Sequence, residues 1–338
     1  MQRLSINWYY QMSIVEIREN SLIRLLKRFE RGSPSVVRGI GDDGAVVRSP
    51  EGQYVFVQDA IVEHVHFEFS FIKPYYLGKK AVYVNVSDVL SMGALPQYLL
   101  ITIGIPMAMT KAQILEIYRG ISAAAKEFNI TMLGGDTVSV HSDFFMDVSM
   151  TGRLVVDDYL GRNKVKKGDM VGVTGYLGES AYGLYILKQG GDIKTRGLKR
   201  FVNRYINPRP PYELWNELIK SGITNGMMDI SDGLIIDLER MMDESKKSAR
   251  IFMEEIPIPP ILKGSSMEEL ALSGGEDYQF LFTFPRDRLP VIENIKRKGY
   301  HVSVIGEVRD GRGVKVIQGG RRRQIKIKGY EHFRDEGT

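Results

Sequence analysis

Aspartates recur where apolar, strand-like runs of the sequence end. An isolated aspartate at such a place is usually a helix N-cap or part of an Asx turn. That explanation weakens here, because segments far apart in the chain repeat the pattern. The residues follow RGIG, YVFVQ, YVNVS and TMLGG or lie within MMDISDG: Asp42, Asp43, Asp59, Asp88, Asp136, Asp229 and Asp232. A fold that brings these strand ends together would gather the carboxylates in one place.

Gathered carboxylates predict a cation site. Two carboxylates 4 Å apart repel by about 4 kcal/mol at an effective dielectric constant near 20, so a cluster needs cations between its members. Ligands that are all oxygen favour Mg²⁺ or Ca²⁺, and the five histidines are too scattered to indicate zinc. Because Mg²⁺ usually binds through a few carboxylates together with substrate phosphates, the pattern predicts a nucleoside triphosphate bound beside these cations.

The phosphate-binding segment is less obvious than the metal ligands. No GxxxxGK[ST] motif occurs, which excludes a Walker A loop. The turn over 175–180, GYLGES, could offer N–H groups to an anion, but a tight strand–helix turn explains it equally well. Gly134, Gly135 and Asp136 are the better candidates, because two residues without side chains would let a nucleotide approach the backbone beside a metal ligand.

Alternating strands and helices are predicted to position these residues. A helix is predicted over 16–29, then strands at GAVV, YVFVQDAIV, AVYVNVSDV and YLLITIGIP. A helix over 111–129 and the strands ITMLGGDTV and FFMDVSMTGRLVV complete this lobe. The glycine- and lysine-rich segment 161–169 predicts a boundary between two α/β domains, residues 1–160 and 161–338.

The second domain is predicted to begin with strand–turn–helix units. MVGVTGYLGESAYGLYIL and MMDISDGLIIDLERMMDES have this pattern, and SGGEDYQFLFTFP predicts a glycine turn before a strand. The basic run Arg321–Arg323 lies within VKVIQGGRRRQIKIK, which predicts a hairpin. With no interleaved aromatics, it indicates a solvated hairpin tip and no nucleic-acid partner.

Composition narrows the function classes. The 338 residues are 43% hydrophobic and 26% charged, a globular balance that can fill two cores. The absence of cysteine excludes disulfides, thiolate metal sites and cysteine nucleophiles. No long uncharged apolar run or secretion signal is visible, so we expect a cytoplasmic protein without a membrane partner. The net charge of +5 identifies no ligand.

Motifs spread over nearly the whole chain carry a family resemblance. In order they are GIGDDGAVV, QDAIVEHVHF, KKAVYVNVSDVLSMGALP, LGGDTV, GRNKVKKGD, MDISDGLIIDL, SGGEDYQFLF and KGYEHF. This series resembles the thiamine-monophosphate kinases, which belong to a superfamily with aminoimidazole ribonucleotide synthetase, selenophosphate synthetase and HypE. The resemblance implies an α/β (α+β) fold whose N-terminal mixed-sheet domain dimerises into a barrel, a C-terminal α/β domain, and ATP bound between the domains.

The resemblance also implies roles for single residues. The implied magnesium ligands, the first five of them also catalytic, are Asp43, Asp59, Asp88, Asp136, Asp229 and Asp232. The implied ATP contacts are Gly135, Asp136, Arg162 and Ser231. The implied contacts to the acceptor are His66, Glu276 and Tyr330, and a carboxylate and an aromatic ring suit a cationic ring-containing substrate.

Two departures from the family pattern concern the metal ligands. The family usually has threonine after the paired aspartates, where this chain has Gly44, and two hydroxyl residues where this chain has Val57 and Gln58. Water or the Gln58 carbonyl would have to replace the missing hydroxyls. The number of metal ions is therefore left open.

The resemblance implies phosphorylation of thiamine phosphate to thiamine diphosphate by in-line transfer from ATP within a homodimer. The alternative is another ATP-using synthetase of the superfamily acting on a different acceptor. Selenophosphate synthetase normally needs a reactive cysteine or selenocysteine, and HypE ends in cysteine, whereas this chain has none. Aminoimidazole ribonucleotide synthetase would lack SGGEDY and KGYEHF. A silent nucleotide- or RNA-binding protein is suggested only by the pI of about 9.1.

Overall fold

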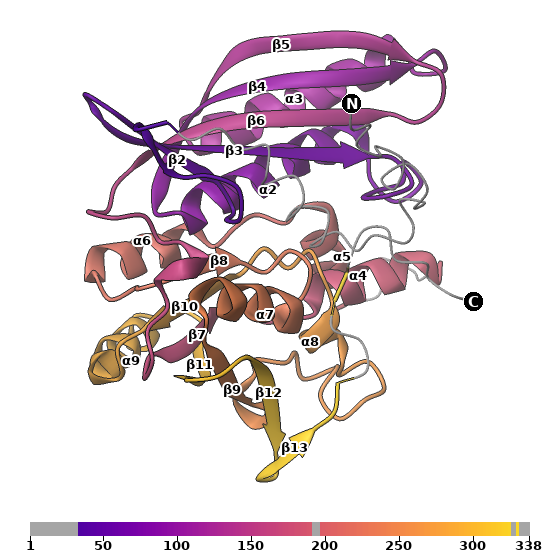
Figure 1. Ribbon diagram of the computed structural model, residues 1–338. Coiled ribbons are helices and arrows are strands. Elements are labelled where there is room, and N and C mark those ends of the chain that lie inside the picture. The colour runs from indigo at the N-terminus through magenta and orange to yellow at the C-terminus, as the bar shows by residue number, and fades with distance from the viewer. Residues whose placement is uncertain (1–32, 191–196, 326–328, 331–338) are drawn as a thin grey trace, which may run out of the picture.

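Two α/β layers stack on each other in the computed structural model, which describes residues 33–190, 197–325 and 329–330 (Figure 1). One mixed sheet comes from residues 36–154 and the other from residues 170–323, on either side of residue 160. The two-domain α/β architecture expected from the sequence is confirmed. The helix predicted over 16–29 lies outside the described residues.

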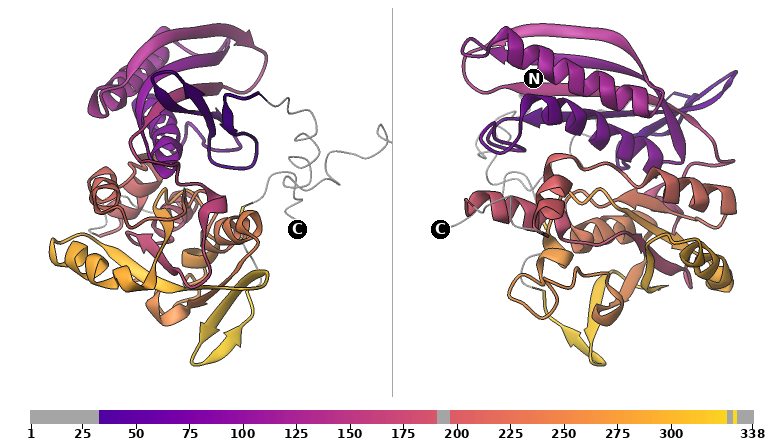
Figure 2. Two further views of the ribbon diagram at one scale, coloured as in Figure 1. Left: turned by 60° about the vertical axis from the view of Figure 1, so that its left-hand side comes forward. Right: turned by 180° about the vertical axis from the view of Figure 1, so that it is seen from behind.

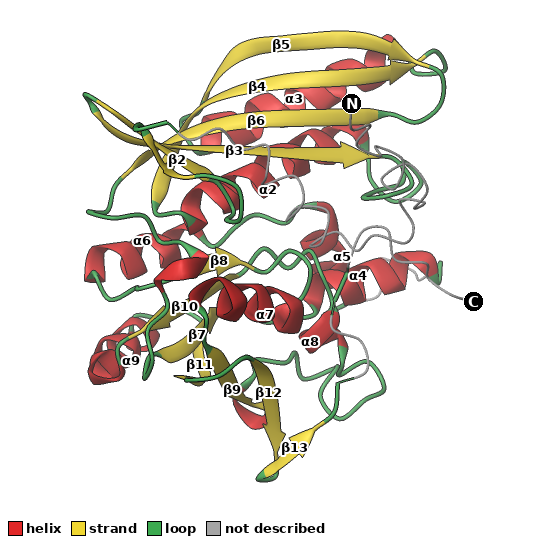
Figure 3. Ribbon diagram, in the orientation of Figure 1, coloured by secondary structure: helices red, strands yellow, loops and turns green. Residues whose placement is uncertain are grey.

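The N-terminal sheet has the strand order β1-β2-β3-β6-β4-β5. Neighbouring strands are antiparallel except β4 and β5, which are parallel because α3 crosses between them. Figure 3 shows α2 and α3 on one face of this sheet. The elements are β1 (Val36–Arg38), β2 (Ala45–Ser49), β3 (Gly52–Val62), α2 (Pro74–Ser91), β4 (Ala94–Pro106), α3 (Lys111–Glu127), β5 (Thr131–Val140) and β6 (Phe145–Leu154).

The segment AVYVNVSDV, predicted as a strand, is part of helix α2, and that prediction was wrong. Pro74 starts the helix at a position where a missing N–H costs nothing. Nearly every residue from Leu77 to Ser91 is buried, because α2 lies between the N-terminal sheet and the C-terminal domain (Figure 2). Burial on all sides removes the polar face that marks a helix in sequence, so β-branched valines imitated a strand.

The C-terminal sheet has the order β13-β12-β9-β11-β7-β10-β8, which puts β8 at the edge nearest α2. The predicted strand–helix unit at MMDISDG and the hairpin at the basic run both form. The elements are η3 (Arg162–Lys164), β7 (Met170–Thr174), α4 (Glu179–Lys188), α5 (Lys199–Ile206), α6 (Tyr212–Ser221), β8 (Met227–Asp229), α7 (Leu234–Ser245), β9 (Ser248–Phe252), η4 (Met253–Glu255), α8 (Leu270–Ser273), β10 (Phe280–Phe284), η5 (Arg286–Arg288), α9 (Leu289–Arg297), β11 (Val302–Arg309), β12 (Gly313–Gln318) and β13 (Arg321–Arg323).

One hydrophobic core spans the two layers, and a second core lies within the C-terminal domain. A continuous cluster of buried side chains runs from β3 and α2 to β10 and α9. Trp215 on α6 is fully buried and donates its Nε1–H to the carbonyl oxygen of Leu90 on α2 at 2.6 Å. This hydrogen bond and the buried cluster pack α2 against both sheets, and so they fix its position relative to the two domains.

Candidate functional site

One stripe of α2 supplies polar side chains to the space between the layers. Lys80, Ser87, Asp88 and Ser91 recur at helical spacing and project toward partners from other elements. Each of these four residues contacts a carboxylate that the sequence singled out. The helix therefore acts as the organising element of the site.

Three predicted metal ligands converge at this stripe. Asp43 lies between β1 and β2, Asp88 lies on α2, and Asp229 ends β8; one carboxylate oxygen from each lies within 4.8 Å of those of the other two. Ser91 donates to Oδ2 of Asp43 at 2.9 Å, and Ser87 donates to Oδ2 of Asp229 at 2.6 Å. Each hydroxyl orients one carboxylate through one of its two oxygens.

Asp59 completes a group of four carboxylates. It lies on β3, on the side that faces α2, and is hydrogen-bonded to Asp88. Burial, followed by the charges of neighbouring aspartates, raises the pKa of Asp59 to about 7. Burial and nearby carboxylates likewise raise the pKa values of Asp88 and Asp229 well above the usual range. Bound protons or cations must neutralise the repulsion between these buried carboxylates. Raised pKa values of this kind are typical of a cation site.

The donor set fits Mg²⁺ better than a softer metal. Asp43, Asp59, Asp88 and Asp229 offer only oxygen atoms, and the Ser87 and Ser91 hydroxyls beside them do too. The carboxylates come from separate elements, so the fold and not local sequence brings their charges together. They would hold magnesium through some of their oxygens while water and phosphate complete its shell.

Arg162 supplies positive charge at the edge of the carboxylate group. Its guanidinium contacts Asp43, and its backbone N–H donates to Oδ1 of Asp42 at 3.1 Å. Arg38 holds the other oxygen of Asp42 at 2.9 Å. Both oxygens of Asp42 are thus bonded to arginines, and the guanidinium of one of them, Arg162, also contacts Asp43. The guanidinium lies where it could exchange Asp43 for a phosphate.

Asp232 is placed beside the group rather than in it. Its carboxylate contacts Arg240, and Asp237 accepts hydrogen bonds from the N–H groups of Asp232 and Gly233 at 3.0 Å each. Asp232 still contributes to the raised pKa of Asp59 through its charge. Any metal contact by Asp232 would therefore compete with Arg240.

The β8–α7 turn gathers three other predicted residues. The N–H of Glu276 donates to the carbonyl oxygen of Ser231 at 2.6 Å, and the N–H of Tyr330 donates to that of Asp232 at 3.0 Å. Tyr330 is 42% exposed, so its ring is accessible. The turn brings Ser231, Glu276 and Tyr330 together although they are far apart in sequence.

His66 approaches the same region from the N-terminal domain. Its Nδ1 accepts from the Val62 N–H at 3.1 Å, and its carbonyl oxygen accepts from the Tyr205 hydroxyl at 3.4 Å. The Tyr205 ring lies 4.2 Å from Lys80 Nζ, which in turn lies 2.6 Å from Glu276 Oε1. Tyr205 thus connects His66 with Glu276.

Gly135 and Asp136 lie away from the carboxylate group, on another part of the N-terminal sheet. Both are exposed on the edge strand β5, which β4 and β6 separate from β3. Three strand spacings place Asp136 about 14 Å from the line of β3. Gly135 has a structural reason of its own, because a Cβ there would lie 1.7 Å from the Ile101 carbonyl oxygen. The metal and ATP roles of these two residues stay predictions.

The glycine turn over 175–180 has a protein ligand. The carboxylate of Asp277 accepts from the Gly178 N–H at 2.5 Å and from the Ser180 N–H at 3.0 Å. The N–H groups that open α4 are therefore already paired with an anion of the chain itself. This favours the structural explanation of the turn over phosphate binding.

Gly44 and Val57, two of the positions that depart from the family pattern, are neighbours in the structure. A Cβ at Gly44 would lie 2.9 Å from Cγ1 of Val55 and of Val57. The valines occupy the space that a threonine at position 44 would need. The side-chain amide of Gln58 donates to Asp147 at 2.8 Å. The hydroxyls that reach the carboxylates come from Ser87 and Ser91 instead.

Sequence reasoning missed the polar residues of α2 and the partners of the loop aspartates. Ser87 lies within AVYVNVSDV, the segment predicted as a strand, and Ser91 follows it, whereas helical spacing puts both close to Asp88. Arg240 follows Asp237 by three residues on α7, a spacing that allows one guanidinium to serve two carboxylates.

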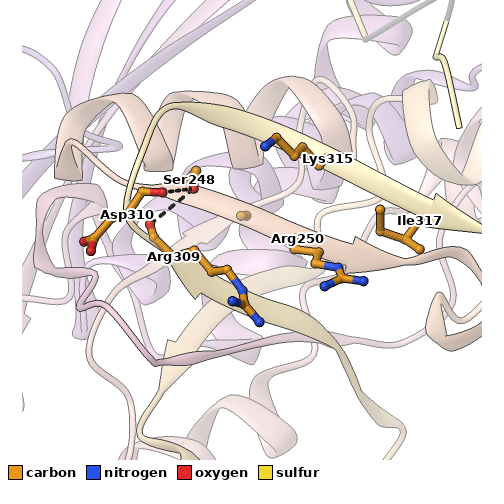
Figure 4. Close-up of a pocket in the computed structure, with 7 residues that line it drawn as sticks. Ser248, Arg250, Arg309, Asp310, Lys315 and Ile317 are labelled. Carbon is orange, nitrogen blue, oxygen red and sulfur yellow. Dashed lines mark hydrogen bonds between the residues drawn. The ribbon is translucent and has the colours of Figure 1, made fainter. Parts of the chain in front are cut away.

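A pocket of about 290 Å³ lies apart from these residues (Figure 4). It is formed at β9, β11 and β12 by residues that include Arg250, Arg309 and Lys315, and Ser248 donates to the Asp310 carbonyl oxygen at 2.8 Å. None of the predicted site residues lines it. The pocket is at the opposite side of the sheet from β8, so it takes no part in the carboxylate site.

Comparison with known proteins agrees with the fold and the motifs. Residues 41–154 match the N-terminal domain of AIR synthase related proteins, and residues 166–319 match the C-terminal domain. The thiamine-monophosphate kinase of Buchnera aphidicola from Acyrthosiphon pisum is 31% identical over 92% of this chain and 97% of its own length. That of Bacillus subtilis is 31% identical over 89% of this chain and 94% of its own.

Solved structures extend the likeness to three dimensions. The structure of AaThiL complexed with AMPPCP and TMP has a TM-score of 0.83 and 29% identity, covering 96% of this chain and 99% of that one. The HypE-HypF complex has a TM-score of 0.70 at 19% identity, which shows a common fold alone. The chain therefore belongs to the thiamine-monophosphate kinase family of phosphotransferases.

Proposed function

We propose that this protein transfers the terminal phosphoryl group of ATP to thiamine phosphate, yielding ADP and thiamine diphosphate. The observation that carries the proposal is the convergence of Asp43, Asp88 and Asp229 from three elements, with Asp59 beside them. Relatives named thiamine-monophosphate kinase and the AaThiL complex with AMPPCP and TMP support the choice of substrates.

The chemistry of the acceptor suits this site. A phosphate oxygen of thiamine phosphate already carries charge, so in-line attack requires no general base. The difficulty is repulsion between two anions, and Mg²⁺ bound at the four carboxylates would supply charge neutralisation. Arg162 would hold phosphate oxygens through its fork of donors, in place of its contact with Asp43.

The acceptor ring is proposed to lie at the other end of the α2 stripe. Glu276, His66 and Tyr330 surround that end through contacts with Lys80, Tyr205 and the β8–α7 turn. Ser231 lies in the same turn, consistent with its proposed ATP contact. This arrangement would separate the ring from the reacting phosphate along the helix.

The homodimer expected from the family belongs to the same proposal. The sheet face turned away from α2 exposes large apolar side chains from two strands, namely Phe56 on β3 and Tyr98 and Leu100 on β4. A second copy against this sheet face would cover the apolar side chains. Among the described residues, no helix combines the length and apolar composition needed to cross a bilayer. Sedimentation at micromolar concentration tests the dimer, and a cytoplasmic location stays a prediction.

An ADP-release assay tests the reaction. With Mg²⁺ and ATP, thiamine phosphate should give ADP and thiamine diphosphate in equal amounts, whereas free thiamine should give neither. Product from free thiamine alone would overturn the choice of acceptor. ADP release that requires another acceptor would favour a different synthetase of the superfamily.

A further inference from the structure

The most deeply buried positive charge of the α2 stripe is unexplained by phosphate chemistry. The Lys80 side chain is 1% exposed, although an unpaired ammonium group in such a place would be costly. Its Nζ lies 2.6 Å from Oε1 of Glu276, 4.2 Å from the Tyr205 ring centre and 3.4 Å from the Tyr205 carbonyl oxygen. Lys80 is therefore held from three directions, all provided by the C-terminal domain.

Glu276 is held as firmly as its partner. Its backbone has φ of +64°, a conformation that costs a non-glycine residue free energy, and its N–H is fixed on Ser231. Its side chain is 24% exposed, so the carboxylate is not enclosed as Lys80 is. Lys80 binds Oε1, and among the described residues Oε2 has no hydrogen-bond or ion-pair partner.

The distance along α2 links this pair to the carboxylate group. Lys80 and Asp88 are eight residues apart, about 12 Å along a helix. Because both ends are fixed to the C-terminal domain, the helix sets the separation between Glu276 and the proposed phosphate site. A ligand that spans the two must match that length.

We propose that Lys80 is a specificity-determining positioning residue, which holds Glu276 so that its free oxygen accepts a hydrogen bond from an N–H group of the acceptor ring. The inference rests on the proposed function and extends it. The Lys80–Glu276 pair is neutral as a whole. Glu276 therefore recognises a hydrogen-bond donor of the acceptor and does not balance its cationic ring.

The sign of one kinetic change separates these two roles. If Lys80 positions Glu276, Lys80→Met should raise KM for thiamine phosphate about tenfold, because the charge-assisted hydrogen bond between the acceptor ring and Glu276 would be lost. The kcat and the KM for ATP should stay within about threefold. A KM for thiamine phosphate that is unchanged or lower would overturn the proposal, since an unpaired Glu276 would attract a cationic ring more strongly.

Matched variants protect the test from a folding artefact. Lys79→Met removes a neighbouring lysine that lies over Tyr83 instead of Glu276, and it should leave every KM unchanged. Lys80→Arg keeps the charge and should recover part of the lost affinity. Glu276→Gln with Lys80→Met should be no worse than the poorer single variant, whereas additive losses would contradict a shared role.

The wild-type protein distinguishes failure of this inference from failure of the proposed function. If wild type releases no ADP with thiamine phosphate, the proposed function fails and the role of Lys80 fails with it. In another outcome, wild type is active while Lys80→Met has a lower kcat, a higher KM for both substrates and a lower melting temperature. In that case Lys80 is structural, and this inference alone fails.

Discussion

Two buried aspartates, Asp229 and Asp277, have nearly equal burial and opposite surroundings. Asp229 is 2% exposed and Asp277 is 1% exposed, and burial raises the pKa of both. Asp229 faces Asp43 and Asp88, and the charges of Asp43, Asp237 and Asp59 add to the rise in its pKa. Asp277 faces the N–H groups of Gly178 and Ser180, which oppose it. The partners of a buried carboxylate, and not its burial, distinguish a cation site from a structural cap.

The structural aspartate also supports the proposed substrate site. Asp277 lies between Glu276 and Tyr278, which have φ of +64° and +45°. Such backbone conformations persist only when neighbouring contacts hold them. The hydrogen bonds of Asp277 to the start of α4 provide that restraint, and so they keep Glu276 against Lys80.

Removing charge from the carboxylate group should have the largest effect. Asp88→Asn and Asp229→Asn should each lower kcat in the ADP-release assay by 10³-fold or more, because the site would lose a ligand that neutralises the reacting phosphates. Without Mg²⁺ both variants should melt at or above the wild-type temperature, since each loses a repulsion.

Asp287→Asn is the matched control, because Asp287 is exposed on η5. It should change neither kcat nor melting temperature. Near-normal turnover in both Asp88→Asn and Asp229→Asn at ordinary Mg²⁺ would refute the assignment of the cation site.

The opposite pattern is expected at the structural aspartate. Asp277→Ala leaves two buried N–H groups without an acceptor and should lower the free energy of unfolding by about 2–4 kcal/mol. Urea unfolding measures this loss. Below the melting temperature kcat should stay within tenfold of wild type, and a 10³-fold loss in a folded Asp277→Ala protein would erase the contrast.

The pH dependence of stability should sharpen the contrast further. Burial, opposed by its N–H partners, raises the pKa of Asp277 to about 7 from the usual 3.8, so the folded state binds the proton more tightly than the unfolded state. The contribution of Asp277 to stability is therefore present below pH 4 and is lost as pH rises through 7.

Asp277→Asn removes this titration and keeps one of the two acceptor oxygens for the N–H groups. Without Mg²⁺, the fall in unfolding free energy from pH 5 to pH 8 should be smaller in Asp277→Asn than in wild type by roughly 1–3 kcal/mol, given about 1.4 kcal/mol per pKa unit. A steeper fall in the variant would show that the sign is wrong.

The smallest effect is expected where packing beside Asp43 departs from the family pattern. Gly44→Ala should destabilise by about 1–3 kcal/mol, because its Cβ would press on Val55 and Val57. Val57→Ala should make the glycine substitution less harmful in the double variant. Thermal unfolding of the four proteins measures the coupling, and strict additivity would mean that the two positions are independent.

Much of the site could be predicted because its residue types, and their places at the ends of apolar runs, are visible in the local sequence. Apolar runs that end in aspartate predicted Asp43, Asp59, Asp88 and Asp229 as one group, and the structure brings these four together. The same pattern included Asp136, which lies on the edge strand of the sheet. A pattern in sequence marks the end of an element but does not state which elements become neighbours.

Other features depended on contacts that no local pattern contains. The valine-rich segment around Asp88 is a helix because two layers bury it, and the glycine turn before α4 is filled by Asp277 from 99 residues away. Lys80 reaches Glu276 only because α2 lies against the second domain.

The sequence by itself determined the kind of chemistry: oxygen ligands, no thiols, and motifs in an order that identifies a family. Only the tertiary structure decided which carboxylates face one another, which are satisfied by N–H groups, and which lysine is buried between the domains. The physical reason is that electrostatic free energy depends on distance and desolvation, and both are set by packing between segments far apart in the chain.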